Sequence, residues 1–262
     1  MRRYLRLYAY FLRFSFSKAM EFRVDFFFRV VMDAIFYATQ IAFFSVLYMH
    51  TTELGGWDYP QILIFVAGFF MIDAIHMTVF ANNMWMLPIF VNKGDLDYYL
   101  VRPVSSLFFL SLRDFAANSF LNLLIASGIL GYALMAYPEP LTAARVLVFL
   151  LLLVNGVFLY YVMNIVFLIP VFWLHSARGL GEIFFALERY AERPERIFVG
   201  YLRRVLVTIL PLSLVISRPV QVLFDGLDLA TLFHFSLVTT LAFLFLVWFW
   251  GRALRSYSSA SS

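Results

Sequence analysis

Long runs of apolar residues, separated by short polar segments, dominate the pattern of the chain. Six of these runs are long enough to cross a bilayer, for which a helix needs about 20 residues. The segments between them carry Gly, Pro or charged residues, which interrupt apolar helices. The pattern predicts an all-α membrane protein with six transmembrane helices, placed at about residues 26–49, 59–86, 107–136, 141–173, 198–217 and 229–250.

The two ends of the chain differ from the apolar runs. Residues 1–25 alternate basic residues with Tyr, Leu and Phe, which is typical of an amphipathic helix lying in the headgroup region of a membrane. A basic flank that only orients the first span is the alternative. Residues 251–262 form a short polar tail. We therefore expect residues 1–262 to form one transmembrane domain that begins with an interfacial helix and contacts membrane lipids.

Composition supports a membrane location and excludes several kinds of chemistry. Hydrophobic residues make up 63% of the chain and charged residues 14%, whereas soluble domains carry about 25% charged residues. The chain has no cysteine, which excludes disulfides, thiolate metal sites and cysteine nucleophiles. The net charge of +4 does not indicate nucleic acid as a partner, because the basic residues lie beside the apolar spans.

The distribution of positive charge predicts the orientation. With six spans, the N-terminal segment, residues 92–106, residues 175–196 and the C-terminus lie on one side of the membrane. Every Lys and Arg except Arg145 and Arg218 falls in these segments or at the adjoining span ends. Lys and Arg accumulate in cytoplasmic loops. We therefore expect both termini to be cytoplasmic.

Motifs for catalysis are missing from the sequence. The two lysines, Lys18 and Lys93, are not part of a phosphate-binding loop, which requires G-x-x-x-x-G-K-[ST]. The four histidines are scattered and form no metal-ligand pattern, and no G-x-S-x-G elbow occurs. The chain is therefore predicted not to be an enzyme, and any ATP that drives its function must be hydrolysed by another chain.

The polar segment 92–106, between the second and third spans, is the most informative short stretch. Asn92 or Asp95 can cap a short helix, and Pro103 favours its end at or before Arg102. Apolar residues three and four positions apart give this helix a stripe, formed by Leu96, Tyr99 and Leu100. Such a stripe fits either a groove on a partner protein or the surface of the membrane.

The same segment resembles a known family. The stretch G-D-L-D-Y-Y-L-V-R-P-V-S, residues 94–105, is similar to the stretch that type-2 ATP-binding cassette (ABC-2) exporter permeases carry between their second and third spans. The later run R-P-E-R-I-F…R-R-V-L…I-L-P, residues 193–211, followed by Arg218 and Pro219, resembles the corresponding region of one branch of that family. The order of spans extends the resemblance over nearly the whole chain.

The resemblance implies a cytoplasmic coupling helix that docks on an ATPase. It also implies a second permease chain, identical or different, two ATPase subunits that bind ATP and magnesium, and a location in the bacterial cytoplasmic (inner) membrane. A re-entrant segment is expected after the fifth span, with Pro211, Arg218 and Pro219. The residues that the resemblance assigns to the ATPase contact are Gly94, Asp95, Leu96, Asp97, Leu100, Arg102 and Pro103.

Polar residues inside the predicted spans are candidates for a transport pathway. A charge at the bilayer centre costs roughly 2.5–3.5 kcal/mol, so such residues usually face protein or water. Asp33 follows Arg29 by four residues, which an ion pair explains. Lining a pathway and forming hydrogen bonds between helices are the two interpretations for the remaining residues, Asp73, Asp114, Asn118, Asn122, Asn155 and Asn164.

Three functions fit this sequence. The favoured one is the permease subunit of an exporter that is powered by a separate ATPase. The high aromatic content, 20%, suits a lipid-like, amphipathic or drug-like substrate. The alternatives are a secondary transporter that couples ions through intramembrane carboxylates, for which Asp73 is the main candidate, and a membrane scaffold or assembly factor that transports nothing.

Overall fold

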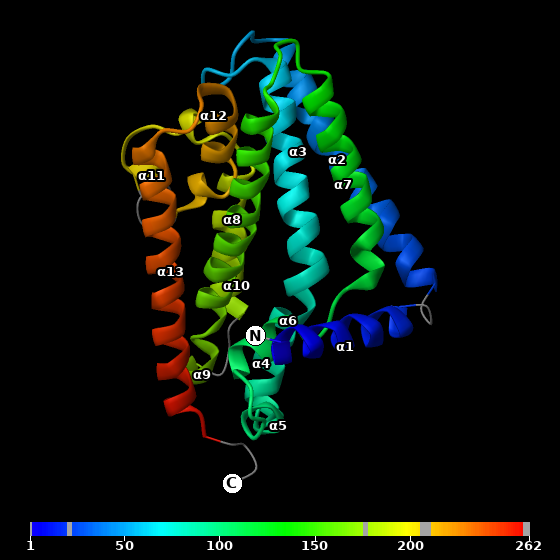
Figure 1. The fold of residues 1–262 in the computed structure, drawn as a ribbon, viewed down its shortest axis with the longest axis vertical. Coiled ribbons are helices and arrows are strands. Elements are labelled where there is room, and N and C mark those ends of the chain that lie inside the picture. Colours follow the sequence, from blue (N-terminus) through cyan, green and yellow to red (C-terminus); the bar gives the residue numbers. More distant parts are fainter. Residues whose placement is uncertain (1, 20–22, 175–177, 205–210, 259–262) are drawn as a thin grey trace.

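The computed structural model describes the chain except for residues 1, 20–22, 175–177, 205–210 and 259–262. The described residues are helical and contain no β-strand. Long helices run side by side along the molecule, and α1 (Arg2–Ala19) lies across them (Figure 1). The coarse prediction of an all-α membrane protein is therefore confirmed.

The N-terminal half of the bundle continues with α2 (Arg23–Tyr48), α3 (Tyr59–His76), a π-helical turn (Met77–Ala81) and α4 (Asn82–Lys93).

Shorter helices alternate with long ones in the rest of the chain. The polar segment 92–106 and the third predicted span contain α5 (Asp97–Leu100), α6 (Ser106–Leu112), a 3-10 turn (Ala117–Ser119) and α7 (Phe120–Met135). The remaining helices are α8 (Ala143–Leu168), α9 (Val171–Leu174), α10 (Arg178–Ala191), a 3-10 turn (Glu195–Ile197), α11 (Gly200–Arg204), another 3-10 turn (Leu212–Leu214), α12 (Ser217–Asp225) and α13 (Leu229–Ser256).

Four of the described helical segments are long and apolar enough to cross a membrane, compared with the six spans predicted from the sequence. The third predicted span is divided into α6, of 7 residues, and the apolar helix α7, of 16 residues. The described part of the fifth contains only short helices. The four segments are Val30–Tyr48, Tyr59–Lys93, Ala143–Leu174 and Leu229–Ser256.

The break in the third predicted span has a clear cause. Asn83 of α4 binds the backbone of Asp114 twice, because its Nδ2 donates to the carbonyl oxygen at 2.7 Å and its Oδ1 accepts from the amide at 2.9 Å. The amide of Ala116 donates to the carbonyl of Thr78 at 2.8 Å. These contacts replace helical hydrogen bonds, so α6 ends at Leu112 and a new helix begins after the turn.

Helix α10 runs along α8 toward the loop between α2 and α3, before the predicted fifth span begins. The ring of Phe184 packs against the rings of Phe167 and Tyr160 in α8. Further along, a Cβ added at Gly55 would lie 3.3 Å from the Cβ of Arg196, so this part of the chain reaches the loop between α2 and α3. The sequence pattern places the segment 175–196 at one membrane surface, but its described residues, 178–196, pass along the bundle.

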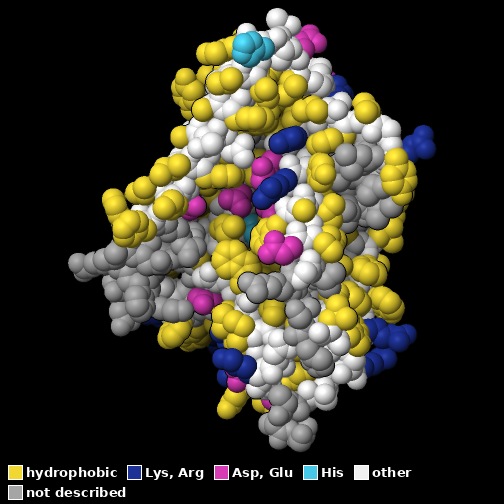
Figure 2. Space-filling view, turned by 180° about the vertical axis from the view of Figure 1, so that it is seen from behind, with side chains coloured by type: hydrophobic (Ala, Val, Ile, Leu, Met, Phe, Trp, Pro, Cys, Tyr) yellow, Lys and Arg dark blue, Asp and Glu magenta, His cyan; other side chains and the backbone are white. Residues whose placement is uncertain are grey.

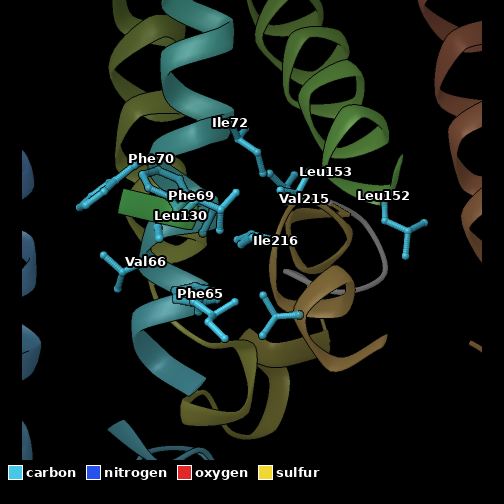
Figure 3. Close-up of a cluster of buried hydrophobic side chains, with 14 of the residues drawn as sticks. Phe65, Val66, Phe69, Phe70, Ile72, Leu130, Leu152, Leu153, Val215 and Ile216 are labelled. Atoms are coloured by element: carbon cyan, nitrogen blue, oxygen red, sulfur yellow. The ribbon is translucent and has the colours of Figure 1, made fainter. Parts of the chain in front are cut away.

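Helix α3 lies at the centre of the bundle and packs against α7 and α8. Its apolar residues are buried on nearly every side. Figure 3 shows Phe65, Phe69 and Ile72 of α3 around a core that Val215 and Ile216 enter from the segment before α12. A second apolar cluster lies nearer to α5 and joins α4 and α6 to α9 and α13. The core thus fixes the position of α3, α4 and the segment that follows them.

Candidate functional site

The segment 94–103 forms a rigid turn at the tip of α4. Gly94 ends the helix in the left-handed conformation, with φ of +79°, which glycine adopts without steric cost. The amide of Leu96 then donates to the carbonyl of Phe90 at 3.2 Å, and the amide of Tyr99 to the carbonyl of Leu96 at 2.9 Å. The short helix α5 therefore leaves α4 at a fixed angle.

The inner face of this turn packs on the bundle. Leu96 is fully buried, in the apolar cluster that also contains Phe90. The ring of Tyr99 lies between those of Phe90 and Phe109, and its hydroxyl accepts a hydrogen bond from Arg113. The apolar stripe predicted from the sequence thus faces inward at Leu96 and Tyr99.

A different set of residues faces outward. Val101 is 81% exposed and Tyr98 is 70% exposed. Arg102 and Pro103 are also exposed, and the Arg102 guanidinium lies over the ring of Phe109 at 5.0 Å. The sequence analysis missed Tyr98 and Val101, although their spacing of three residues places them on one helical face. We call the exposed residues of this turn, 98 and 100–103, the outer face.

Helix α1 supports the same region from the side. Tyr4 packs edge-on against Phe108, and its hydroxyl accepts from the Ser105 amide at 3.3 Å. A pocket of about 510 Å³ lies between α1 and residues 102–104, and three arginines line it, Arg3, Arg6 and Arg102. The turn after α4 is therefore held by both the bundle and the N-terminal helix.

The second feature is an acidic cavity of about 440 Å³ between α2, α3 and α10. Figure 2 shows acidic side chains gathered in a hollow about halfway along the molecule, with basic and hydrophobic side chains beside them. Asp73, in the middle of the span Tyr59–Lys93, is one of its lining residues. The other acidic lining residues are Asp33, Glu182, Glu188 and Glu192.

Hydrogen bonds from three helices position the carboxylates of this cavity. The Tyr160 hydroxyl in α8 donates to Glu188. Gln40 in α2 donates to Glu192 at 3.2 Å, and the amide of Asn122 in α7 donates to Asp33. The cavity is therefore built from the fold, with polar partners behind the acidic side chains.

Comparison with known protein families decides the class. The family model described as "ABC-2 family transporter protein" matches residues 34–261. The chain belongs to the ABC-2 family of transporter proteins. Neither the curated proteins nor the solved structures searched give a match. The family resemblance that residues 94–105 predicted is confirmed.

Other polar residues of this ABC-2 protein have structural partners. The Asn155 amide in α8 donates to the hydroxyl of Thr239 in α13 at 2.9 Å. Asp114 lies at the break between α6 and α7, where Asn83 binds its backbone. Asn164 is half-buried in α8, and the side chains of Asn118 and Arg29 lie outside the described part of the chain. Among the predicted pathway residues whose side chains the structure describes, only Asp73 lines the acidic cavity, and Asn122 contacts it through Asp33.

One of the residues predicted for a re-entrant segment, Arg218, holds α12 against the 3-10 turn Glu195–Ile197. Arg218 forms an ion pair with Glu195 at 3.4 Å, and the same carboxylate accepts from Gln221 at 3.5 Å. Pro219 is buried, and Pro211 precedes the 3-10 turn that enters the core. In this ABC-2 protein the re-entrant character of the segment stays a prediction. The sequence analysis did not identify Glu188, because its place in the cavity depends on the contact between α8 and α10.

Proposed function

We propose that this ABC-2 protein is the permease subunit of an exporter and that a separate ATPase docks on the outer face of the turn after α4. The observation that carries the proposal is the combination of a buried inner face and an exposed apolar outer face on one short helix. Because Leu96 and the Arg113–Tyr99 hydrogen bond fix the turn to the bundle, a push on the outer face moves α4 and the spans attached to it.

The partners follow from this mechanism. Two ATPase subunits bind ATP and magnesium and close on each other, and a second permease chain, identical or different, completes the pathway. The bundle lies in the bacterial cytoplasmic membrane, with both termini and the outer face in the cytoplasm. Two further crossings bring the number to six, one formed by α6 with α7 and one by α10 with the segment that follows it. The fifth crossing then begins before residues 198–217, where the sequence pattern placed it. The substrate is amphipathic or lipid-like.

Copurification with an ATPase tests the docking surface. The permease is solubilised together with ATPases encoded near it, as the wild type and as Tyr98→Asp and Val101→Asp. Both changes place a charge on an exposed apolar position, so we expect the ATPase to be lost while the permease still elutes as a folded protein. Val199→Asp is the matched control, because Val199 is 82% exposed and belongs to the part of the chain that contacts the opposite end of the bundle.

The outcomes separate the proposal from its alternatives. Retention of the ATPase by both outer-face variants contradicts the docking surface. If no ATPase copurifies with the wild type, the permease proposal fails, and an ion-coupled transporter that uses Asp73 or a scaffold becomes the better explanation. Dependence of transport on a proton gradient would favour the ion-coupled transporter.

A further inference from the structure

The acidic cavity gathers far more acidic than basic side chains at membrane depth. Five carboxylates line it, and Arg189 is the one basic residue in its described lining. The carboxylates of Asp33, Glu188 and Glu192 lie close enough to Asp73 to interact with it electrostatically. Like charges in a medium of low dielectric constant repel strongly. A bound cation relieves this repulsion.

A buried histidine without a hydrogen-bond partner lies close to the acidic residues of the cavity. His76 follows Asp73 by three residues, so it lies on the same face of α3, and its ring packs edge-on against Tyr160 at 4.5 Å. Tyr160 in turn donates to Glu188 in the cavity. His76 is only 3% exposed, and both of its ring nitrogens are without a hydrogen bond. A buried polar group without a partner is rare and calls for an explanation.

The walls of the cavity show which kind of cation fits. Phe36, Phe69 and Phe185 line it together with Met77. Aromatic rings attract cations through their faces, whereas a small hydrated ion gains nothing from apolar walls. The volume of about 440 Å³ is within the range of small-molecule sites. The lining therefore suits a cation that carries its own apolar surface.

We propose that the cavity between α2, α3 and α10 binds a lipophilic organic cation and that this cation is the transported substrate. The carboxylates of Asp73 and Glu188 neutralise the positive charge, and the phenylalanine side chains pack on its apolar groups. The assignment as substrate rests on the proposed permease function, but binding of the cation does not. The site lies between helices at membrane depth, where an amphipathic cation can enter from the bilayer.

Equilibrium dialysis with two ions of matched shape tests the proposal. The probes are tetraphenylphosphonium and tetraphenylborate, which have closely similar size and opposite charge. The purified chain is placed in nanodiscs of zwitterionic lipid, and empty nanodiscs give the background. We expect saturable binding of tetraphenylphosphonium and none of tetraphenylborate. Equal binding of the two ions, or no saturable binding of the cation, would overturn the proposal.

Neutral variants identify the binding residues. Asp73→Asn and Glu188→Gln keep the shape of the side chain and remove its charge, and each should weaken cation binding by about tenfold, as expected for the loss of one charged contact. Glu182→Gln, at the exposed edge of the cavity, should weaken it less and provides a change that does not disturb packing. Glu139→Gln, in the exposed loop before α8, is the control and should bind as the wild type does.

The results distinguish this inference from the proposed function. The dialysis needs no ATPase, so cation binding that depends on Asp73 and Glu188 stands even where no ATPase copurifies. In that case the permease proposal fails and the cation site is retained. If an ATPase copurifies and all acidic variants bind the cation as the wild type does, the permease proposal stands and the cation site is refuted.

Discussion

Leu96 lies at the contact between the turn after α4 and the rest of the bundle. Its side chain is fully buried among residues of α4, α6 and α13, including Met84, Leu110 and Trp250. Its neighbour Tyr98 is 70% exposed. Two neighbouring residues thus have opposite roles, because Leu96 holds the turn to the bundle and Tyr98 is exposed on its outer face.

Truncation of Leu96 should therefore lower the stability of the fold, and not only change the proposed docking surface. Leu96→Ala removes buried methyl groups and leaves a cavity, which costs about 2–5 kcal/mol. We expect a lower midpoint in thermal unfolding, measured by the fraction of detergent-solubilised protein that still elutes at its native size after heating. Val101→Ala is the control and should leave the midpoint unchanged, because Val101 is 81% exposed. Equal midpoints for the two variants would contradict the packing of this turn.

At the scale of the elements, hydropathy predicts the long apolar helices well and the short ones poorly. The runs around α2, α3 with α4, α8 and α13 have enough apolar residues to be recognised locally. The break between α6 and α7 depends on Asn83 binding Asp114, residues 31 positions apart, which no local pattern shows. The hydropathy pattern did not predict that α10 runs along the bundle, because the acidic residues that face the cavity make this helix too polar to be recognised as a span.

The contact between α8 and the segment before α12 is another element that only the structure shows. A Cβ added at Gly156 would lie 2.2 Å from the backbone carbonyl oxygen of Val215. This distance is below any allowed contact, and a backbone atom cannot turn aside as a side chain can. Glycine at this position therefore allows the two segments to touch.

Substitution of this glycine should push the segments apart. Gly156→Ala is expected to cost about 1–3 kcal/mol by overpacking and to lower the thermal midpoint. Gly68→Ala should cost less, because its Cβ would meet the terminal methyl group of Ile216, at 2.6 Å, and that methyl group can rotate away. Gly128→Ala meets no atom within 4 Å and should not lower the midpoint. A midpoint for Gly156→Ala as high as that of Gly128→Ala would refute the close contact.

At the scale of the whole molecule, the fold changes the interpretation of the charge pattern. The Arg193 guanidinium lies 6.0 Å from the ring of Phe43, near the end of α2, and Arg196 adjoins Gly55. These arginines therefore belong to the end of the bundle opposite the turn after α4. Helix α1 and the C-terminal end of α13 lie toward the same end of the molecule as α5 (Figure 1). The predicted orientation is therefore supported by fewer positive charges than the sequence pattern counts.

Labelling of single cysteines tests this topology directly. The chain has no cysteine of its own, so a membrane-impermeant maleimide reports only the introduced residue. Thr52→Cys, in the exposed loop after α2, should be labelled in intact cells, and Val101→Cys only after permeabilisation. Val199→Cys separates the two topologies, because the sequence pattern places this residue at the cytoplasmic start of the fifth span. In the structure the chain just before it contacts the loop that contains Gly55. If Val199→Cys is labelled in intact cells, as Thr52→Cys is, the path of α10 along the bundle is supported. If Val199→Cys is labelled only after permeabilisation, residue 199 lies on the same side as the turn after α4, and this path of α10 is refuted.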